Sequence, residues 1–314
     1  MTLMNIQLRH IRCFTAVSDE LSFARAAQRL HLSQPALSQT ILQLEERLGF
    51  PLFERTTRSV ALTAAGKRLM THARALSLSV EAFEDEARSL RLLLKNELRV
   101  GYMIGTAVQF IPEIVREFER LRPDASLHLQ EFDFRDPTAG LHDGIVDCGI
   151  IRPPVGLAGI ELVDIAHETC VVCLPTGHRL SRKKTVLLDD ILDEPIVAAP
   201  VPGIWRDYWL ASSYRAGRPA KVAYEAATVE SELQAVASGR GISITSESTA
   251  SYYARPGVVF RPFADMNKCV VAIGHRGRPS KLVADFISVV KSVSASVAIS
   301  GDKSRSTRAI RLKR

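Results

Sequence analysis

Polar side chains that can hydrogen-bond to nucleic acid are concentrated near the start of this 314-residue chain. Amides and hydroxyls recur along residues 33–48, and such groups donate to and accept from the edges of bases. Two arginines follow within residues 51–62, and guanidinium groups suit contact with phosphate. This pattern predicts that the segment binds DNA. The candidate contact residues are Ser33, Gln34, Pro35, Ser38, Gln39, Gln43, Arg55 and Arg58.

Three helices and a hairpin are expected to position these side chains. Residues 33–48 carry leucine or isoleucine at i, i+4, i+7 and i+11, which fixes one side of a helix to a core and leaves the glutamines outward. Ser33 suits the N-cap of that helix, Pro35 its first turn and Gly49 its end. Apolar spacing predicts two earlier helices, and residues 51–62 predict a two-stranded hairpin. The apolar residues of the three helices are Leu8, Ile11, Phe14 and Val17, then Phe23, Ala26, Ala27 and Leu30, then Leu37, Ile41, Leu44 and Leu48.

The alternative interpretation of Gln34, Gln39 and Gln43 is that they are only solvated positions on a surface helix. The order of the elements favours DNA contact, because a tight turn joins two helices ahead of a basic hairpin. The charge agrees: the chain has a net charge of +7, and residues 1–70 hold nine Lys or Arg against five Asp or Glu. A basic balance is expected of a protein that binds a polyanion.

A long helix is predicted over residues 63–95. Thr63 suits its N-cap, and apolar residues then recur in alternating steps of four and three. Such a repeat, sustained over several heptads, is typical of two helices that supercoil, so this helix is expected to form a dimer. The alternative is that it packs on the C-terminal domain of its own chain. The seam residues are Leu69, Ala73, Leu76, Val80, Phe83, Ala87, Leu90 and Leu94.

Residues 96–297 alternate between strand-like and helical segments, which is typical of an α/β domain. A first lobe is expected over about 96–166 and 267–297, and a second over about 167–266. Two lobes joined by two crossings form a hinged cleft that can close on a small molecule. Residues 298–314 are basic and lack an apolar period, so they are expected to form a disordered tail.

The loops at the carboxyl ends of the predicted strands are the candidate ligand site, since ligands of such sheets bind there and near helix N-termini. Hydroxyls, backbone N–H groups and the Arg152 guanidinium suit a carboxylate, which predicts a small organic anion as the effector. The alternative is that Arg152 pairs with a local acid such as Asp147 or Glu161. The candidate effector-binding residues are Gly105, Thr106, Asp133, Phe134, Arg152, Pro202, Gly203, Thr228, Thr245 and Ser246.

The five cysteines are odd in number and scattered, and no secretion signal is evident, which argues against a disulfide framework. Cys170 and Cys173 form a C-x-x-C in an apolar strand, where alternation points the two thiols to opposite faces. A dithiol switch or a zinc site is therefore disfavoured. A redox signal at Cys170, Cys173 or Cys269 is the alternative to a metabolite.

Motifs of catalysis are missing from the sequence: it has no Gly-rich phosphate loop, no HExxH, no G-x-S-x-G and no cluster with metal-ligand spacing. We expect no enzymatic activity, no metal and no cofactor. A solute-binding or transferase-like protein would need an export signal or a catalytic constellation, and neither is found. With no apolar run near the roughly 20 residues of a membrane span, the chain is expected to be cytoplasmic.

The N-terminal part of the chain resembles the LysR-type transcriptional regulators. This resemblance implies an α+β multidomain fold with a winged helix-turn-helix over 1–62, a dimerising linker helix over 63–95 and a two-lobed α/β domain of periplasmic-binding-protein type over 96–297. The matching motifs are Ser22-Phe23 with Ala26-Ala27, Ser33-Gln34-Pro35-Ala36-Leu37-Ser38, Leu44-Glu45, Leu48-Gly49, Leu52-Phe53 with Arg55, and Leu62-Thr63 with Gly66.

The same resemblance implies a function. It predicts a dimer, pairing into a tetramer, that binds an operator with an inverted repeat and responds to a small-molecule inducer; RNA polymerase is a further candidate partner. It also makes Gln34, Pro35, Ser38 and Gln39 the base readers. Arginine is common in the family at the position of Gln39. Because glutamine pairs more naturally with adenine than with guanine, the operator preference is expected to differ there.

Overall fold

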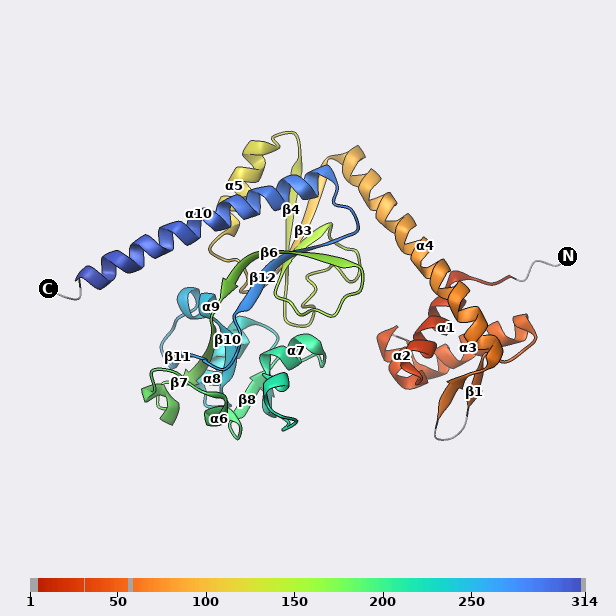
Figure 1. Ribbon diagram of the computed structural model, residues 1–314, viewed down its shortest axis with the longest axis horizontal. Coiled ribbons are helices and arrows are strands. Elements are labelled where there is room, and N and C mark those ends of the chain that lie inside the picture. The colour runs from red at the N-terminus through yellow and green to blue at the C-terminus, as the bar shows by residue number, and fades with distance from the viewer. Residues whose placement is uncertain (1–4, 31, 56–58, 312–314) are drawn as a thin grey trace. The chain divides into compact units, whose positions relative to one another are not determined.

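The computed structural model describes the backbone of residues 5–30, 32–55 and 59–311 (Figure 1). The chain divides into two compact units, Met1–Ala87 and Arg88–Arg314. Among the described residues, no helix is both long and apolar enough to cross a bilayer.

Unit 1 contains the three helices and the hairpin that the sequence predicted. Ser22 Oγ accepts a hydrogen bond from the Arg25 N–H, and Ser33 Oγ accepts one from the Ala36 N–H, so hydroxyls cap the second and third helices. Gly49 follows the third helix at φ +79°, a left-handed conformation that favours glycine. The elements are α1 (Leu8–Glu20), α2 (Phe23–Arg29), α3 (Gln34–Leu48) and the antiparallel strands β1 (Phe53–Arg55) and β2 (Val60–Leu62).

The core of unit 1 differs from the predicted apolar stripe of α1. Leu8 is 54% exposed because it is the first residue of the helix, whereas His10 and Cys13 are buried. Burial and the nearby charge of Arg47 lower the pKa of His10, and its ring Nδ1 accepts a hydrogen bond from the Gln7 N–H. A polar residue thus occupies a core position of α1 that the predicted apolar stripe did not include.

Helix α4 (Ala64–Lys95) begins where predicted, and Thr63 Oγ1 accepts a hydrogen bond from the Gly66 N–H at 3.0 Å. The first seam residues, Leu69 and Ala73, pack in the core of unit 1 and so are not free for a partner helix. Later seam residues form an exposed apolar row in the single chain. Their exposed fractions are 47% for Leu76, 74% for Phe83, 48% for Leu90 and 81% for Leu94.

The first lobe of unit 2 is a five-stranded sheet covered by two helices. Phe118 of α5 and Phe286 of α10 meet edge to face with their ring centroids 5.7 Å apart, and both pack on apolar residues of the central strands. The strand order is β4-β3-β5-β12-β6; β3 is parallel to β4 and β5, and β12 is antiparallel to β5 and β6. The bounds are β3 (Glu97–Met103), α5 (Ile111–Leu121), β4 (Ser126–Phe132), β5 (Cys148–Ile151), β6 (Ile160–Glu168), β12 (Cys269–Arg276) and α10 (Lys281–Arg311).

The second lobe lies between the two crossings of the chain, one from β6 to β7 and one from β11 to β12. Its central strand β7 pairs antiparallel with β10 and β11, and β8 pairs parallel with β9. A parallel bridge between Ile196 of β8 and Ile242, the residue before β10, links the two-stranded sheet to the three-stranded one. The bounds are β7 (Cys170–Pro175), α6 (Leu188–Ile191), β8 (Pro195–Ala198), α7 (Ile204–Trp209), β9 (Lys221–Glu225), α8 (Val229–Ala237), β10 (Ser243–Ser246), α9 (Glu247–Tyr252) and β11 (Val258–Pro262).

Helix α10 continues through residues 298–311, where the sequence predicted a tail. Turns follow β4, and in them the Asp136 carboxylate accepts hydrogen bonds from the N–H groups of Thr138 and Gly140.

Replacing Phe286 with alanine should destabilise unit 2 by about 3–5 kcal/mol, because it removes the ring that packs between α5 and α10 and leaves a cavity there. Urea unfolding followed by tryptophan fluorescence measures this loss, since both tryptophans, Trp205 and Trp209, lie in unit 2. Leu121→Ala, at a position of α5 that is 48% exposed, is the control and should cost less than about 1 kcal/mol. Equal losses in the two variants would contradict the assigned core.

Candidate functional site

Helix α3 buries one side and presents the other to solvent. Leu37, Ile41 and Leu44 are at most 2% exposed and hold the helix in the core of unit 1. The predicted DNA-contacting residues of α3 and its N-cap lie at or near the surface, which leaves the amide groups of Gln34, Gln39 and Gln43 available to a DNA groove. Ser33, Gln34, Pro35, Gln39 and Gln43 are exposed, and Ser38 is half-buried.

Hydrogen bonds to Glu45 of α3 hold the hairpin that follows this helix against it. Glu45 Oε1 accepts hydrogen bonds from the N–H groups of Leu52 and Phe53, and Oε2 pairs with Arg55 at 2.8 Å. The Arg55 guanidinium also lies over the ring of Phe23, 4.6 Å from its centroid. Arg55 therefore has structural partners already, although it was predicted as a phosphate contact.

Arg58, the second predicted phosphate contact, lies outside the described residues.

A pocket lies between the two lobes of unit 2, and its empty space, including the part open to solvent, is about 570 Å³. Gly105, at φ +77°, brings the loop after β3 close to α8, since a Cβ there would lie 2.7 Å from Val229 Cγ2. The Phe134 N–H donates to the Ala227 carbonyl at 2.8 Å and also joins the lobes. The first lobe contributes Met103, Ile104, Gly105, Thr106, Phe134 and Arg152; the second contributes Val197, Ala198, Ala199, Trp205, Arg206, Trp209, Leu210, Ala226, Val229, Glu232, Ile244, Thr245, Ser246 and Thr249.

Arg152 forms a buried ion pair with Glu168, 2.9 Å between Nη2 and Oε2, and the two side chains are 4% and 10% exposed. Ser248 accepts a hydrogen bond from Arg152 and donates its own N–H to Glu168. Burial opposes ionisation of Glu168, but the charge of Arg152 and the Ser248 hydrogen bonds outweigh it and lower the pKa of this carboxyl. Arg152 is therefore paired with an acid, as the alternative interpretation held.

That acid is neither of the two the sequence suggested. Asp147 instead accepts hydrogen bonds from the Arg91 side chain and the Arg99 N–H.

Six of the ten predicted effector-binding residues line the pocket: Gly105, Thr106, Phe134, Arg152, Thr245 and Ser246.

The other four are not brought into it. Asp133 pairs with the exposed Arg135, and Thr228 Oγ1 accepts from the Ser231 N–H as the N-cap of α8. Pro202 and Gly203 are exposed in the loop before α7. These four positions were predicted because they follow strand ends or precede helices. The same residue types also cap helices and form ion pairs at the surface, and such positions carry no ligand.

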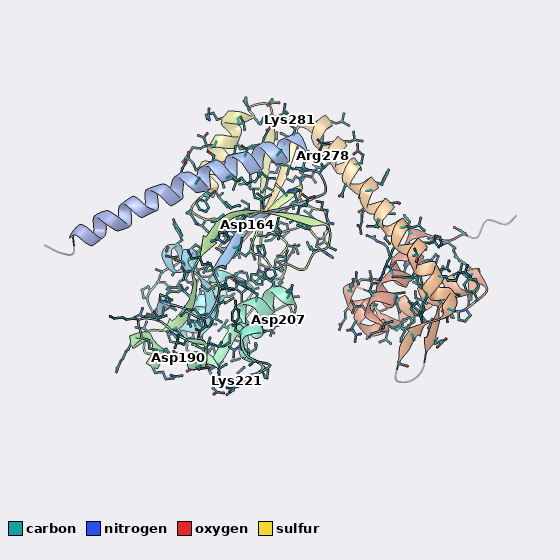
Figure 2. All side chains as sticks on the ribbon, in the orientation of Figure 1. Asp164, Asp190, Asp207, Lys221, Arg278 and Lys281 are labelled. Carbon is teal, nitrogen blue, oxygen red and sulfur yellow. The ribbon has the colours of Figure 1, made fainter. Side chains whose placement is uncertain are left out.

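Two features of the pocket were not predicted from the sequence: a row of aromatic side chains and a buried acid. Trp205 and Trp209 lie four residues apart on α7, the helix that also carries the Asp207 labelled in Figure 2. Their ring centroids are 6.0 Å apart, and the Phe134 centroid is 5.3 Å from that of Trp205. The sequence does contain a signal for these residues, because its only two tryptophans lie four residues apart, shortly after a predicted strand.

Glu232 is the missed acid; it lines the pocket from α8, and its side chain is buried. Burial raises the pKa of this carboxyl to about 7. A neutral carboxyl group can donate a hydrogen bond as well as accept one.

Comparison with known proteins agrees with this architecture. Residues 8–67 match the model of the bacterial regulatory helix-turn-helix protein, LysR family, and residues 93–295, more than half of the chain, match the LysR substrate binding domain. A DNA-binding domain followed by an effector-binding domain defines a ligand-responsive class of transcriptional regulator. The chain belongs to the LysR family.

Three relatives cover most of the chain. The HTH-type transcriptional regulator AlsR of Bacillus subtilis is 31% identical over 251 residues, 79% of this chain and 83% of that protein. The structure of full-length BenM, a regulator of Acinetobacter baylyi, has a TM-score of 0.55 at 26% identity and covers 93% of this chain and 98% of BenM. Full-length CbnR in complex with its target DNA has a TM-score of 0.50 at 25% identity, covering 92% and 100%.

Replacing Glu232 with glutamine should flatten the pH dependence of stability. The pKa of Glu232 is about 7 in the folded protein against an ordinary 4.5, so protonation stabilises the fold fully below pH 4.5, and that contribution is lost as the pH rises to 7. The loss is on the order of 3 kcal/mol. Urea unfolding at pH 5 and pH 8 should show the parent chain losing that much more than Glu232→Gln. Parallel losses in both proteins would refute the assignment.

Proposed function

We propose that this regulator binds an inverted-repeat operator as a homodimer, paired into a tetramer, and that a small organic anion in the interlobe pocket controls its DNA binding or bending. The observation that carries the proposal is α3, whose leucines are buried while Gln34, Gln39 and Gln43 face solvent. An α-helix fits the major groove, where amide side chains pair best with adenine. Operator DNA is therefore the expected partner of this face.

The exposed row on α4 supports dimerisation. A single chain leaves Leu76, Phe83, Leu90 and Leu94 between 47% and 81% exposed. A second α4 packed against this row would remove those side chains from water, which is the main driving force for helix pairing. Two recognition helices related by a two-fold axis would then read the two halves of an inverted repeat.

The pocket supports control by a ligand, because residues of both lobes line it. A ligand that contacts both lobes favours one arrangement of them over another. Couplings of this kind are typically about 1–3 kcal/mol, enough to change operator occupancy severalfold or more. In the assembled tetramer, closure would alter the relative positions of the DNA-binding domains and so the bend of the operator.

We also propose that the protein works in the cytoplasm and that RNA polymerase is the partner that reads the altered promoter.

The alternative signal, oxidation of cysteine, is supported less well. The neighbouring Cys269 thiol lowers the pKa of Cys170. The Cys170 thiol donates a hydrogen bond to the Asn267 carbonyl, and the Cys269 thiol donates one to the Glu168 carbonyl. Cys170 and Cys173 belong to different hydrophobic clusters, so they do not form a dithiol with each other. All five cysteines are buried, and both thiols of the Cys170 and Cys269 pair are 0% exposed, which shields them from oxidants. We therefore favour the ligand.

Gln34→Ala should weaken binding to the cognate operator by about 1–3 kcal/mol and relax the preference at one base pair, because it removes a bidentate base contact. Competition binding at fixed salt against single-base operator variants measures both effects. Gln234→Ala, an exposed helical glutamine of unit 2, is the matched control and should change neither. An equal loss on every sequence would make Gln34 a positioning contact only.

Leu76→Glu should weaken the dimer by about tenfold or more, because it places a charge from each chain in the apolar seam. Sedimentation equilibrium over a concentration series gives the association constants. Leu78→Glu is the control, since Leu78 is 65% exposed on the same helix but lies outside the seam. Equal weakening by both variants, or by neither, would count against dimerisation through this row.

A further inference from the structure

Helix α3 exposes one large apolar side chain. Leu42 is 44% exposed, whereas Leu37, Ile41 and Leu44 are at most 2% exposed and hold the helix in the core of unit 1. Single exposed leucines are common on protein surfaces, so exposure alone assigns no role to this one. Its neighbours on the helix decide what it contacts.

Leu42 lies on the polar side of α3, the helix labelled in Figure 1. Residues three and four positions apart are neighbours on a helix surface. Ser38 and Gln39 therefore adjoin Leu42 on the turn before it, and Glu46 adjoins it on the turn after. Gln39, Gln43 and Glu46 are exposed. Leu42 is thus the apolar member of the surface that presents the candidate base readers.

The major groove of DNA offers a leucine one favourable contact. The base edges there present nitrogen and oxygen donors and acceptors, and the C5 methyl of thymine is the apolar group among them. A leucine over a nitrogen or oxygen displaces water and returns no hydrogen bond, which costs free energy. A leucine over a methyl group removes both apolar surfaces from water. An apolar side chain on a groove-facing surface therefore favours thymine.

The neighbouring amide is compatible with the same preference. Glutamine pairs with N6 and N7 of adenine, and adenine lies opposite thymine in the duplex. Gln39 and Leu42 are three residues apart, so the two side chains reach base edges that are close together in the groove. An amide and an apolar group side by side suit a site that contains A·T pairs.

We propose that Leu42 is a specificity-determining residue that packs against the C5 methyl of a thymine in each half of the operator. The inference rests on the proposed function in that α3 is the helix that enters the major groove. It adds a contact that involves no hydrogen bond, made by a residue outside the set predicted from the sequence.

Replacing thymine with deoxyuridine tests the contact, because the exchange removes the C5 methyl and leaves every hydrogen-bonding group of the base in place. Each thymine of the inverted repeat selected by the full-length protein is replaced in turn, at both symmetry-related positions. At one position the parent protein should bind roughly tenfold more weakly, since one buried methyl group is lost from each half-site. If no replacement weakens binding, the proposal is overturned.

Leu42→Ala identifies the side chain responsible. Alanine is the best helix former, so the variant should fold. It should bind the thymine duplex about as weakly as the parent protein binds the deoxyuridine duplex, and deoxyuridine should then cost it little more. A further loss as large as that of the parent would show that another residue contacts the methyl group, and would refute the assignment.

Two further variants serve as controls. Leu42→Met keeps an apolar side chain of similar volume and should retain most of the preference for thymine. Leu121→Ala removes a leucine of similar exposure from unit 2 and should change neither affinity. Loss of the preference in Leu121→Ala as well would contradict a direct contact by Leu42.

The failure of this inference can be told apart from the failure of base reading by α3. If Gln34→Ala relaxes the preference at a base pair while Leu42→Ala keeps the full preference for thymine over deoxyuridine, α3 remains the reading helix and the role of Leu42 is overturned. If neither variant changes any base preference, the proposed function of α3 fails too. A changed oligomeric state of Leu42→Ala with an unchanged preference for thymine would make Leu42 a protein contact and overturn the proposal.

Discussion

The attachment of α3 to the core of unit 1 is the constraint on which the rest of the account depends. Leu37, Ile41 and Leu44 remove one side of this helix from water, and burial of such side chains stabilises a fold by about 1.5–3 kcal/mol each. The opposite side is left polar and accessible. Glu45 accepts hydrogen bonds from the backbone N–H groups of Leu52 and Phe53, so the hairpin is held against the helix that carries the exposed glutamines.

In unit 2 the equivalent constraint is the buried pair of Arg152 and Glu168. It joins the loop after β5 to the end of β6, and Ser248 of α9 completes its hydrogen bonds from the second lobe. Removing one member would leave a buried charge without a partner, which typically costs 3–5 kcal/mol. The pair therefore stabilises the junction between the two lobes.

Features set by local spacing were predictable from the sequence. Helix α3 and the alternation of Cys170 and Cys173 follow from periods of 3.6 and 2 residues. The start of α4 follows from the capping hydroxyl of Thr63. Pairing across the fold was not predictable. Glu168 meets Arg152 because β6 and β5 both pair with β12, an arrangement that spacing along the chain does not encode.

The candidate ligand site shows the same division. The loops of Gly105, Thr106 and Phe134 were predicted from strand ends and line the pocket, whereas Thr228 caps α8 and does not line it. A capping threonine and a ligand-binding threonine look the same in the sequence. The end of α10 is a second case: the helix continues through residues 298–311, whose composition alone predicted a tail without regular structure.

Selection of DNA fragments by the purified full-length protein tests the central claim most directly. Fragments of the source genome would be bound at moderate salt against random competitor DNA, recovered and sequenced. The account predicts enrichment of a shared inverted repeat, with the two halves about one or more helical turns apart. Recovery of fragments without any common sequence, in proportion to their length alone, would contradict it.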